Sequence, residues 1–435
     1  MREEFSADTI LRWLVFPILI LVFAFQAYAC RGIYADGAHF FLQLLVSSDF
    51  PRWDPQRMIN HYVTLGPTVL ALKMGAHNLV FLRYLFSTWL LLCPLLVWGA
   101  ALWNRRGDGL FWPFVLLFCF VYYSTNFFAI GEYNLCFALA AYCCAELIGP
   151  LPQGRLRRAC LLVAAALLSF HYPSTLFHGT LLFLLVVIKP RDEWKGASQF
   201  YKFALAFLFA GSVVTALWSV LLPQDPANFA SARDSSVALH DVQFRSVVLY
   251  VIAGNGLFLA RRPWIRYALL VLCSILLITV ELDPLRLYVF TRYALRAYVA
   301  LALALCGIGL WWFRHRFEKP PALCRSEAWI PAAMAMLLLV TLSWYDIQLS
   351  LDYKKYLGMF GAIVNGQTGL VPYERTGYPF LAQNERFKWI WIYPVMSVVL
   401  CDDSQKAILL NPSWYHGWQP FDPHNNVPNL DKYYR

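Results

Sequence analysis

The residue best suited to chemistry follows the first apolar segment of the chain, residues 11–30. Asp36 lies six residues beyond that segment, and Gly37 and a stretch of Phe and Leu at helical spacing come directly after it. A carboxylate beside a hydrophobic surface helix is partly desolvated, and desolvation makes it a better proton acceptor. Asp36 is therefore a candidate general base. The alternative is that Asp36 caps the helix that follows, because Asp is favoured at that position.

Arginines form a second candidate group, because a guanidinium fork matches a phosphate or pyrophosphate. Three arginines fall within 11 residues at 286–296. Arg292 is the first candidate for binding a phosphate group and Arg286 the second. Pairing with Glu281, Asp283 or lipid phosphates is the alternative for each of them. Ionisable residues at membrane depth are costly unless they are paired or face a cavity, so each is a functional candidate.

Four further residues are candidates for positioning a sugar or an acceptor. They are polar groups near the ends of apolar segments and one tryptophan in a loop rich in proline. Aromatic rings provide flat apolar faces on which sugar rings can stack, and such a loop leaves a ring free to overhang a cavity. The predicted substrate-binding residues are His39, Glu132, His171 and Trp418.

The composition places the chain in a membrane. It is 59% hydrophobic and only 14% charged, with a mean hydropathy of +0.50, whereas soluble domains are about 25% charged. This excludes a cytosolic enzyme, a disulfide-stapled secreted domain and a disordered tail. The net charge of +10 comes from short basic clusters between apolar runs. That is the positive-inside pattern of membrane proteins, and it argues against nucleic acid as a partner.

The hydropathy pattern predicts an all-α polytopic protein with about 11 membrane spans. The segment 159–188 is interrupted at His171 and has basic flanks, so it contributes two short spans or a re-entrant pair. Segment 61–78 is expected to be an interfacial or partly inserted helix. The remaining predicted spans are 11–30, 79–103, 110–130, 133–149, 199–222, 244–260, 267–281, 294–313 and 328–345.

This count puts the N-terminus in the cytoplasm and the C-terminus in the periplasm. Residues 1–345 then form a transmembrane domain with a first outer loop at 31–60. Residues 346–435 contain many prolines and aromatics, and we expect them to form a small outward cap of α/β or irregular structure. No Asn-x-Ser/Thr glycosylation site with a permitted middle residue occurs, which favours the inner membrane of a bacterium.

The order of these features resembles the GT-C superfamily of integral-membrane glycosyltransferases, which includes protein mannosyltransferases, aminoarabinose transferases and oligosaccharyltransferases. The matching features are a first span followed by Tyr34-Ala35-Asp36-Gly37, a surface helix, the stretch 67–83, a later Gly131-Glu132 and an outward C-terminal portion. The chain has Gly37 where the family has a second acid. It also lacks the Trp-Trp-Asp-Tyr signature, which excludes the oligosaccharyltransferase branch.

The resemblance implies an inverting glycosyltransferase with a polyprenyl-phosphate sugar as donor and a glycan, lipid or protein as acceptor. Asp36 would then be the base. It implies no organic cofactor, and a divalent metal has no support in the sequence. The alternatives are a transporter or flippase of lipid-linked saccharides, and a membrane acyltransferase using His171. The deep segments are almost uncharged and no internal repeat is visible, which disfavours a transporter.

Overall fold

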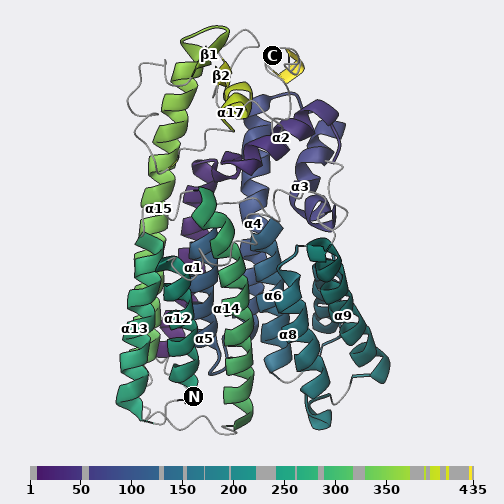
Figure 1. Ribbon diagram of the computed structural model, residues 1–435, viewed down its shortest axis with the longest axis vertical. Coiled ribbons are helices and arrows are strands. Elements are labelled where there is room, and N and C mark those ends of the chain that lie inside the picture. The colour runs from purple at the N-terminus through teal and green to yellow at the C-terminus, as the bar shows by residue number, and fades with distance from the viewer. Residues whose placement is uncertain are drawn as a thin grey trace, which may run out of the picture.

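The described part of the molecule is almost entirely helical. The computed structural model describes residues 7–50, 58–126, 132–149, 154–170, 172–194, 197–221, 242–259, 262–282, 289–316, 329–372, 387, 392–401, 408–410 and 431–433. Long helices run side by side along the long axis, and shorter elements gather at the end opposite the N-terminus (Figure 1). Within the described residues, the only sheet is a parallel pair of three-residue strands. The predicted all-α class is confirmed.

Each predicted apolar segment coincides with one helix or, at 159–188, with two. The interruption predicted near His171 is confirmed, because α7 ends at Leu168 and α8 begins at Thr175. The helices of the bundle are α1 (Ala7–Tyr28), α4 (Leu79–Arg105), α5 (Phe111–Thr125), α6 (Glu132–Ile148), α7 (Arg155–Leu168), α8 (Thr175–Ile188), α9 (Gln199–Leu221), α12 (Val242–Leu259), α13 (Pro263–Leu282), α14 (Val289–Arg316) and α15 (Trp329–Asn365).

The shorter elements come from both ends of the chain. Segment 61–78 is mostly helical, as predicted, and lies beside α2 in the upper part of Figure 1. These elements are η1 (Arg31–Ile33), α2 (Asp36–Ser47), α3 (Met58–Lys73), η3 (Arg191–Trp194), β1 (Leu370–Pro372), α17 (Tyr393–Leu400), β2 (Ile408–Leu410) and η8 (Asp431–Tyr433). All but η3 lie at the end of the molecule away from the N-terminus (Figure 1).

Four helices in the described residues are long and apolar enough to cross a membrane: Thr9–Tyr28, Leu79–Arg105, Gln199–Ser219 and Ala332–Asn365. On α9 the outward side chains include Phe200, Phe203, Phe207 and Trp218, each more than 60% exposed. A run of large exposed apolar side chains at helical spacing suits lipid rather than water. The protein is therefore membrane-associated, while the full count of 11 spans stays a prediction.

Helix α15 differs from the expected division of the chain at residue 345. It runs without a break from Trp329 to Asn365, so the expected boundary falls inside a helix. Its 37 residues span about 55 Å, well beyond the ~30 Å of a hydrocarbon core. The sequence prediction stopped at 345 because charged residues begin at Asp346. These charges interrupt the hydropathy but not the helix, whose face of Tyr353, Tyr356 and Phe360 is buried.

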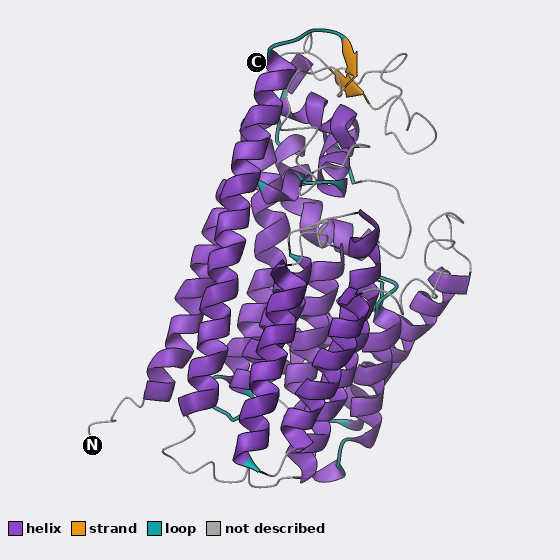
Figure 2. Ribbon diagram, turned by 60° about the vertical axis from the view of Figure 1, so that its left-hand side comes forward, coloured by secondary structure: helices purple, strands orange, loops and turns teal. Residues whose placement is uncertain are grey.

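The described pieces of the C-terminal tail pack on the first outer loop. Helix α17 contacts α2, and the hydroxyl of Tyr433 donates to the Leu45 carbonyl at 2.9 Å. All eight residues of α17 are buried. Figure 2 shows the two strands beyond the end of the helical bundle. The cap expected at 346–435 stays a prediction, because much of it lies outside the described residues.

A buried ion pair joins the chain just after α1 to the middle of α15. Arg31 is fully buried and Asp346 is 3% exposed. Nη1 of Arg31 donates to both carboxylate oxygens at 2.8 Å and to Ser350 Oγ at 3.1 Å. Asn126 of α5 bridges the pair: Nη2 of Arg31 donates to its Oδ1 at 3.1 Å, and its Nδ2 donates to Asp346 at 3.0 Å. Gln26 of α1 donates to the same carboxylate at 2.8 Å.

Glycine at position 32 lets η1 lie directly against α4. The backbone nitrogen of Gly32 donates to Ser87 Oγ at 2.8 Å. A Cβ at this position would lie 2.6 Å from the Cα of Ser87, a distance at which backbone atoms must move. Only glycine permits this approach. The loop after α1 is therefore held on both sides, by α4 through Gly32 and by α15 through Arg31.

We expect Arg31→Met to destabilise the protein by about 3–5 kcal/mol, because Asp346 would be left as a buried, unpaired charge. The double variant Arg31→Met, Asp346→Leu removes both charges and is expected to recover part of that loss. The measurement is the thermal midpoint of the detergent-solubilised protein, followed by tryptophan fluorescence.

Lys73→Met is the matched control. It removes the ion pair between Lys73 and Asp49, in which the charged atoms lie 3.1 Å apart and both side chains are more than half exposed. Such surface pairs contribute about 0–1 kcal/mol. A midpoint for Arg31→Met no lower than that of Lys73→Met would contradict the role assigned to the buried pair.

Candidate functional site

Asp36 is the first residue of α2, and the turn before it has an unusual backbone. Ala35 has φ 55° and ψ −128°, and it is fully buried. A residue other than glycine with such a φ costs on the order of 1–3 kcal/mol, and the surrounding packing must hold it there. Ala35 occupies the N-cap position, so Asp36 stands in the first turn of α2 and not at its cap. Asp36 is half-buried, and it is not the N-cap residue that the alternative interpretation required.

His39 shares a face of α2 with Asp36, because residues three apart on a helix are neighbours. The His39 side chain is buried, and burial lowers its pKa from 6.5 to about 4. Nε2 of Gln43 lies 3.0 Å from Nε2 of His39. An amide nitrogen only donates, so this ring nitrogen accepts and the imidazole is neutral. The structure therefore brings together two of the predicted site residues, one acidic and one neutral at pH 7.

The other predicted site residues are only partly described or lie outside the description. Glu132 is the first residue of α6, and Arg292 lies in the first turn of α14, but the structure describes neither side chain. Arg286, His171 and Trp418 lie outside the described residues. Their roles stay predictions.

Helix α3 carries a buried polar face that sequence reasoning missed. Asn60, Thr64 and Thr68 are spaced four apart and are each at most 1% exposed. Thr64 donates to the Asn60 carbonyl at 2.8 Å. Both polar atoms of the Asn60 side chain and the Thr68 hydroxyl have no hydrogen-bond partner among the described residues. An unsatisfied buried polar group costs about 1–3 kcal/mol, so each calls for a ligand or a water.

The helices that α3 contacts carry two more buried polar atoms for which the described residues offer no hydrogen-bond partner. They are Oε1 of Gln43 on α2 and Oδ1 of Asn134 on α6. Helix α3 contacts α2, α4 and α6. These groups, with those of α3, offer both donors and acceptors of the kind that sugar hydroxyls require. The spacing of Asn60, Thr64 and Thr68 was a usable signal, but Asn60 was assigned to the loop 31–60 and the two threonines to a helix predicted to be interfacial or partly inserted.

Metal binding has no candidate in this part of the chain. Among the described residues, no group of three or more His, Cys, Asp or Glu side chains is placed to hold a metal ion.

Comparison with known proteins provides no guide to function: no protein-family model, no curated protein and no solved structure matches the chain. The assignment of function therefore depends on the side chains themselves.

The low pKa of His39 makes a prediction about stability. Between pH 6.5 and about 4 the unfolded chain protonates this imidazole and the folded protein does not. The contribution of His39 to stability is therefore fully present above pH 6.5 and is lost as the pH falls toward 4. We expect the thermal midpoint of His39→Gln to fall less between pH 7.5 and pH 5 than that of the unsubstituted protein.

His77→Gln is the control, because His77 is exposed. It is expected to keep the pH dependence of the unsubstituted protein. Equal changes in midpoint for the unsubstituted protein and His39→Gln would mean that His39 is not held in its neutral form.

Proposed function

We propose that the protein is an integral-membrane, inverting glycosyltransferase of the GT-C type. It transfers a sugar from a polyprenyl-phosphate donor to an acceptor on the outer face of a bacterial inner membrane. The observation that carries the proposal is the environment of Asp36: a half-buried acid that follows a membrane-length helix, on a helix that contacts α3, which carries buried polar side chains. A transferase needs a proton acceptor beside groups that bind hydroxyls.

In the proposed reaction Asp36 takes the proton from an acceptor hydroxyl while that oxygen attacks the anomeric carbon of the donor. The bond between this carbon and the phosphate oxygen breaks, and its electron pair leaves with the polyprenyl phosphate. Attack from the face opposite the leaving group inverts the anomeric centre. Asn60 and Gln43 would bind sugar hydroxyls through their unpaired polar atoms. Arg292, with Arg286 second, would stabilise the growing charge on the phosphate.

The distribution of basic residues supports a cytoplasmic N-terminus, a periplasmic C-terminus and a multi-pass topology of about 11 spans. Arg12 near the start of α1 donates to the carbonyls of Arg106 and Asp108 in the turn after α4. Lys189 lies within electrostatic range of Arg105 and Arg314. These basic residues therefore meet at one end of the bundle, which the positive-inside rule assigns to the cytoplasm. Helix α2, which begins at Asp36, lies toward the opposite end (Figure 1).

The test uses purified protein in lipid nanodiscs with a panel of undecaprenyl-phosphate monosaccharides and an envelope extract as the source of acceptor. We expect release of undecaprenyl phosphate from at least one donor, measured by mass spectrometry. Asp36→Asn should lower that rate by about 10²–10⁴-fold, because general-base help is typically of that size. Its thermal midpoint should stay close to that of the unsubstituted protein.

Asp49→Asn is the matched control, because Asp49 is an exposed acid of the same outer segment and pairs with Lys73. It is expected to keep the full rate. Full turnover by Asp36→Asn would exclude this residue as the base. Movement of the intact donor across a vesicle membrane without cleavage would instead favour the transporter or flippase.

A further inference from the structure

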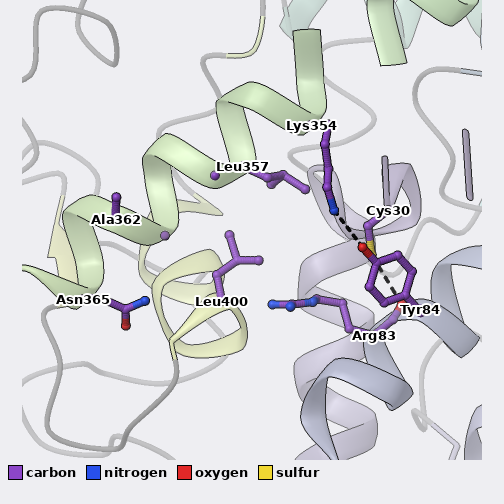
Figure 3. A pocket seen from close by; sticks show the side chains of 10 residues that line it. Cys30, Arg83, Tyr84, Lys354, Leu357, Ala362, Asn365 and Leu400 are labelled. Atoms are coloured by element: carbon purple, nitrogen blue, oxygen red, sulfur yellow. Dashed lines mark hydrogen bonds between the residues drawn. The ribbon is translucent and has the colours of Figure 1, made fainter. Parts of the chain in front are cut away.

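A cavity of about 240 Å³ lies where α4, α15 and α17 meet the residue that follows α1. Arg83 and Tyr84 come from α4, Lys354 and Asn365 from α15, and Cys30 from the turn before η1. Figure 3 shows Arg83 extending into the space below α15, and Lys354 pointing from α15 toward Tyr84. Asp36 does not line this cavity. The chemistry of the cavity is therefore separate from that of Asp36, the proposed base.

Two cations face the cavity, and neither has an acidic partner in the part of the chain that the structure describes. Nη1 of Arg83 donates to the Val399 carbonyl at 3.3 Å, and Nζ of Lys354 donates to the Tyr84 hydroxyl at 2.7 Å. Both acceptors are neutral. Among the described residues no carboxylate lies within ion-pair distance of either side chain, whereas buried Arg31 has one. Both cations are half-buried, and two like charges beside one partly desolvated cavity favour an anion there.

The α15 wall of the cavity leaves room for a ligand. Gly358, Gly361 and Ala362 line it, at helical spacing that puts them on one face. A Cβ built on Gly358 or Gly361 would have no neighbouring atom within 4 Å. The cavity volume of about 240 Å³ is below the usual 300–1,000 Å³ of a site for a whole small molecule. The cavity therefore suits a compact charged group.

One of the side chains that line the cavity is the thiol of Cys30. Burial raises the pKa of Cys30 to about 11, even though Arg83 and Lys354 act in the opposite direction. Cys30 is therefore a neutral thiol at pH 7 and adds no charge. The electrostatic character of the cavity comes from Arg83 and Lys354.

We propose that this cavity binds a phosphate-bearing anion, with Arg83 and Lys354 as its ligands. The arginine fork suits two phosphate oxygens and lysine adds a point charge. The phosphate belongs either to a lipid headgroup or to free phosphate. Lys354 also lies over the rings of Tyr28 and Tyr84, 5.0 and 5.2 Å from their centroids. Tyr28, 56% exposed, ends the membrane-length segment of α1, where tyrosines typically meet the headgroups.

The test measures binding to the detergent-solubilised protein by native mass spectrometry and by the shift in thermal midpoint. The probes are dioleoyl phosphatidic acid, dioleoyl phosphatidylcholine and inorganic phosphate. We expect phosphatidic acid to bind at least tenfold more tightly than phosphatidylcholine. Arg83→Gln and Lys354→Gln should each weaken that binding at least tenfold. Gly361→Leu keeps both charges but fills the space, and it should weaken binding as well.

Lys73→Gln and Arg106→Gln are the controls, because both side chains are exposed and neither lines the cavity. They are expected to bind phosphatidic acid normally. If inorganic phosphate raises the thermal midpoint and Arg83→Gln abolishes that rise, free phosphate is a sufficient ligand. If only phosphatidic acid has an effect, the ligand is a lipid headgroup. The proposal is overturned if neither phosphatidic acid nor inorganic phosphate binds, or if the cavity variants bind phosphatidic acid as well as the controls do. Because no sugar transfer is measured, the result is independent of the glycosyltransferase function.

Discussion

The ion pair between Arg31 and Asp346 is the constraint on which the outer end of the molecule depends. Two charges removed from water are tolerated only when further polar groups hydrogen-bond to them, and here Gln26, Asn126 and Ser350 provide such bonds. The pair joins η1 to a helix 315 residues further along the chain. It therefore determines where the first outer loop lies.

The short segment held by this pair separates two chemical environments. Before it, Cys30 lines a cavity with two cations, neither of which has an ion-pair partner among the described residues. After it, the turn at Ala35 leads into α2, which carries Asp36 and His39 and contacts α3. One rigid turn thus positions an anion-binding cavity and a candidate base on neighbouring elements.

The length of α15 explains how the helical bundle supports the elements at the end away from the N-terminus. Its apolar first part lies in the bundle, and its later part carries Lys354 and the small residues that line the cavity. A single unbroken helix transmits its position over this distance, since each backbone hydrogen bond connects consecutive turns. Helix α17 packs beside it and covers α2, so the outer end is built on α15 as a support.

The sequence by itself determined the membrane class, the helical segments and the break in 159–188, because hydropathy and helix formation depend on near neighbours along the chain. It also predicted a helix directly after Asp36. It could not identify the pair of Arg31 with Asp346, nor the meeting of Arg83 with Lys354, since these residues lie far apart in sequence and only packing brings them together. The end of α15 was missed for a related reason: the charges after residue 345 lower the hydropathy, but burial of Tyr353 and Tyr356 in the tertiary structure continues the helix.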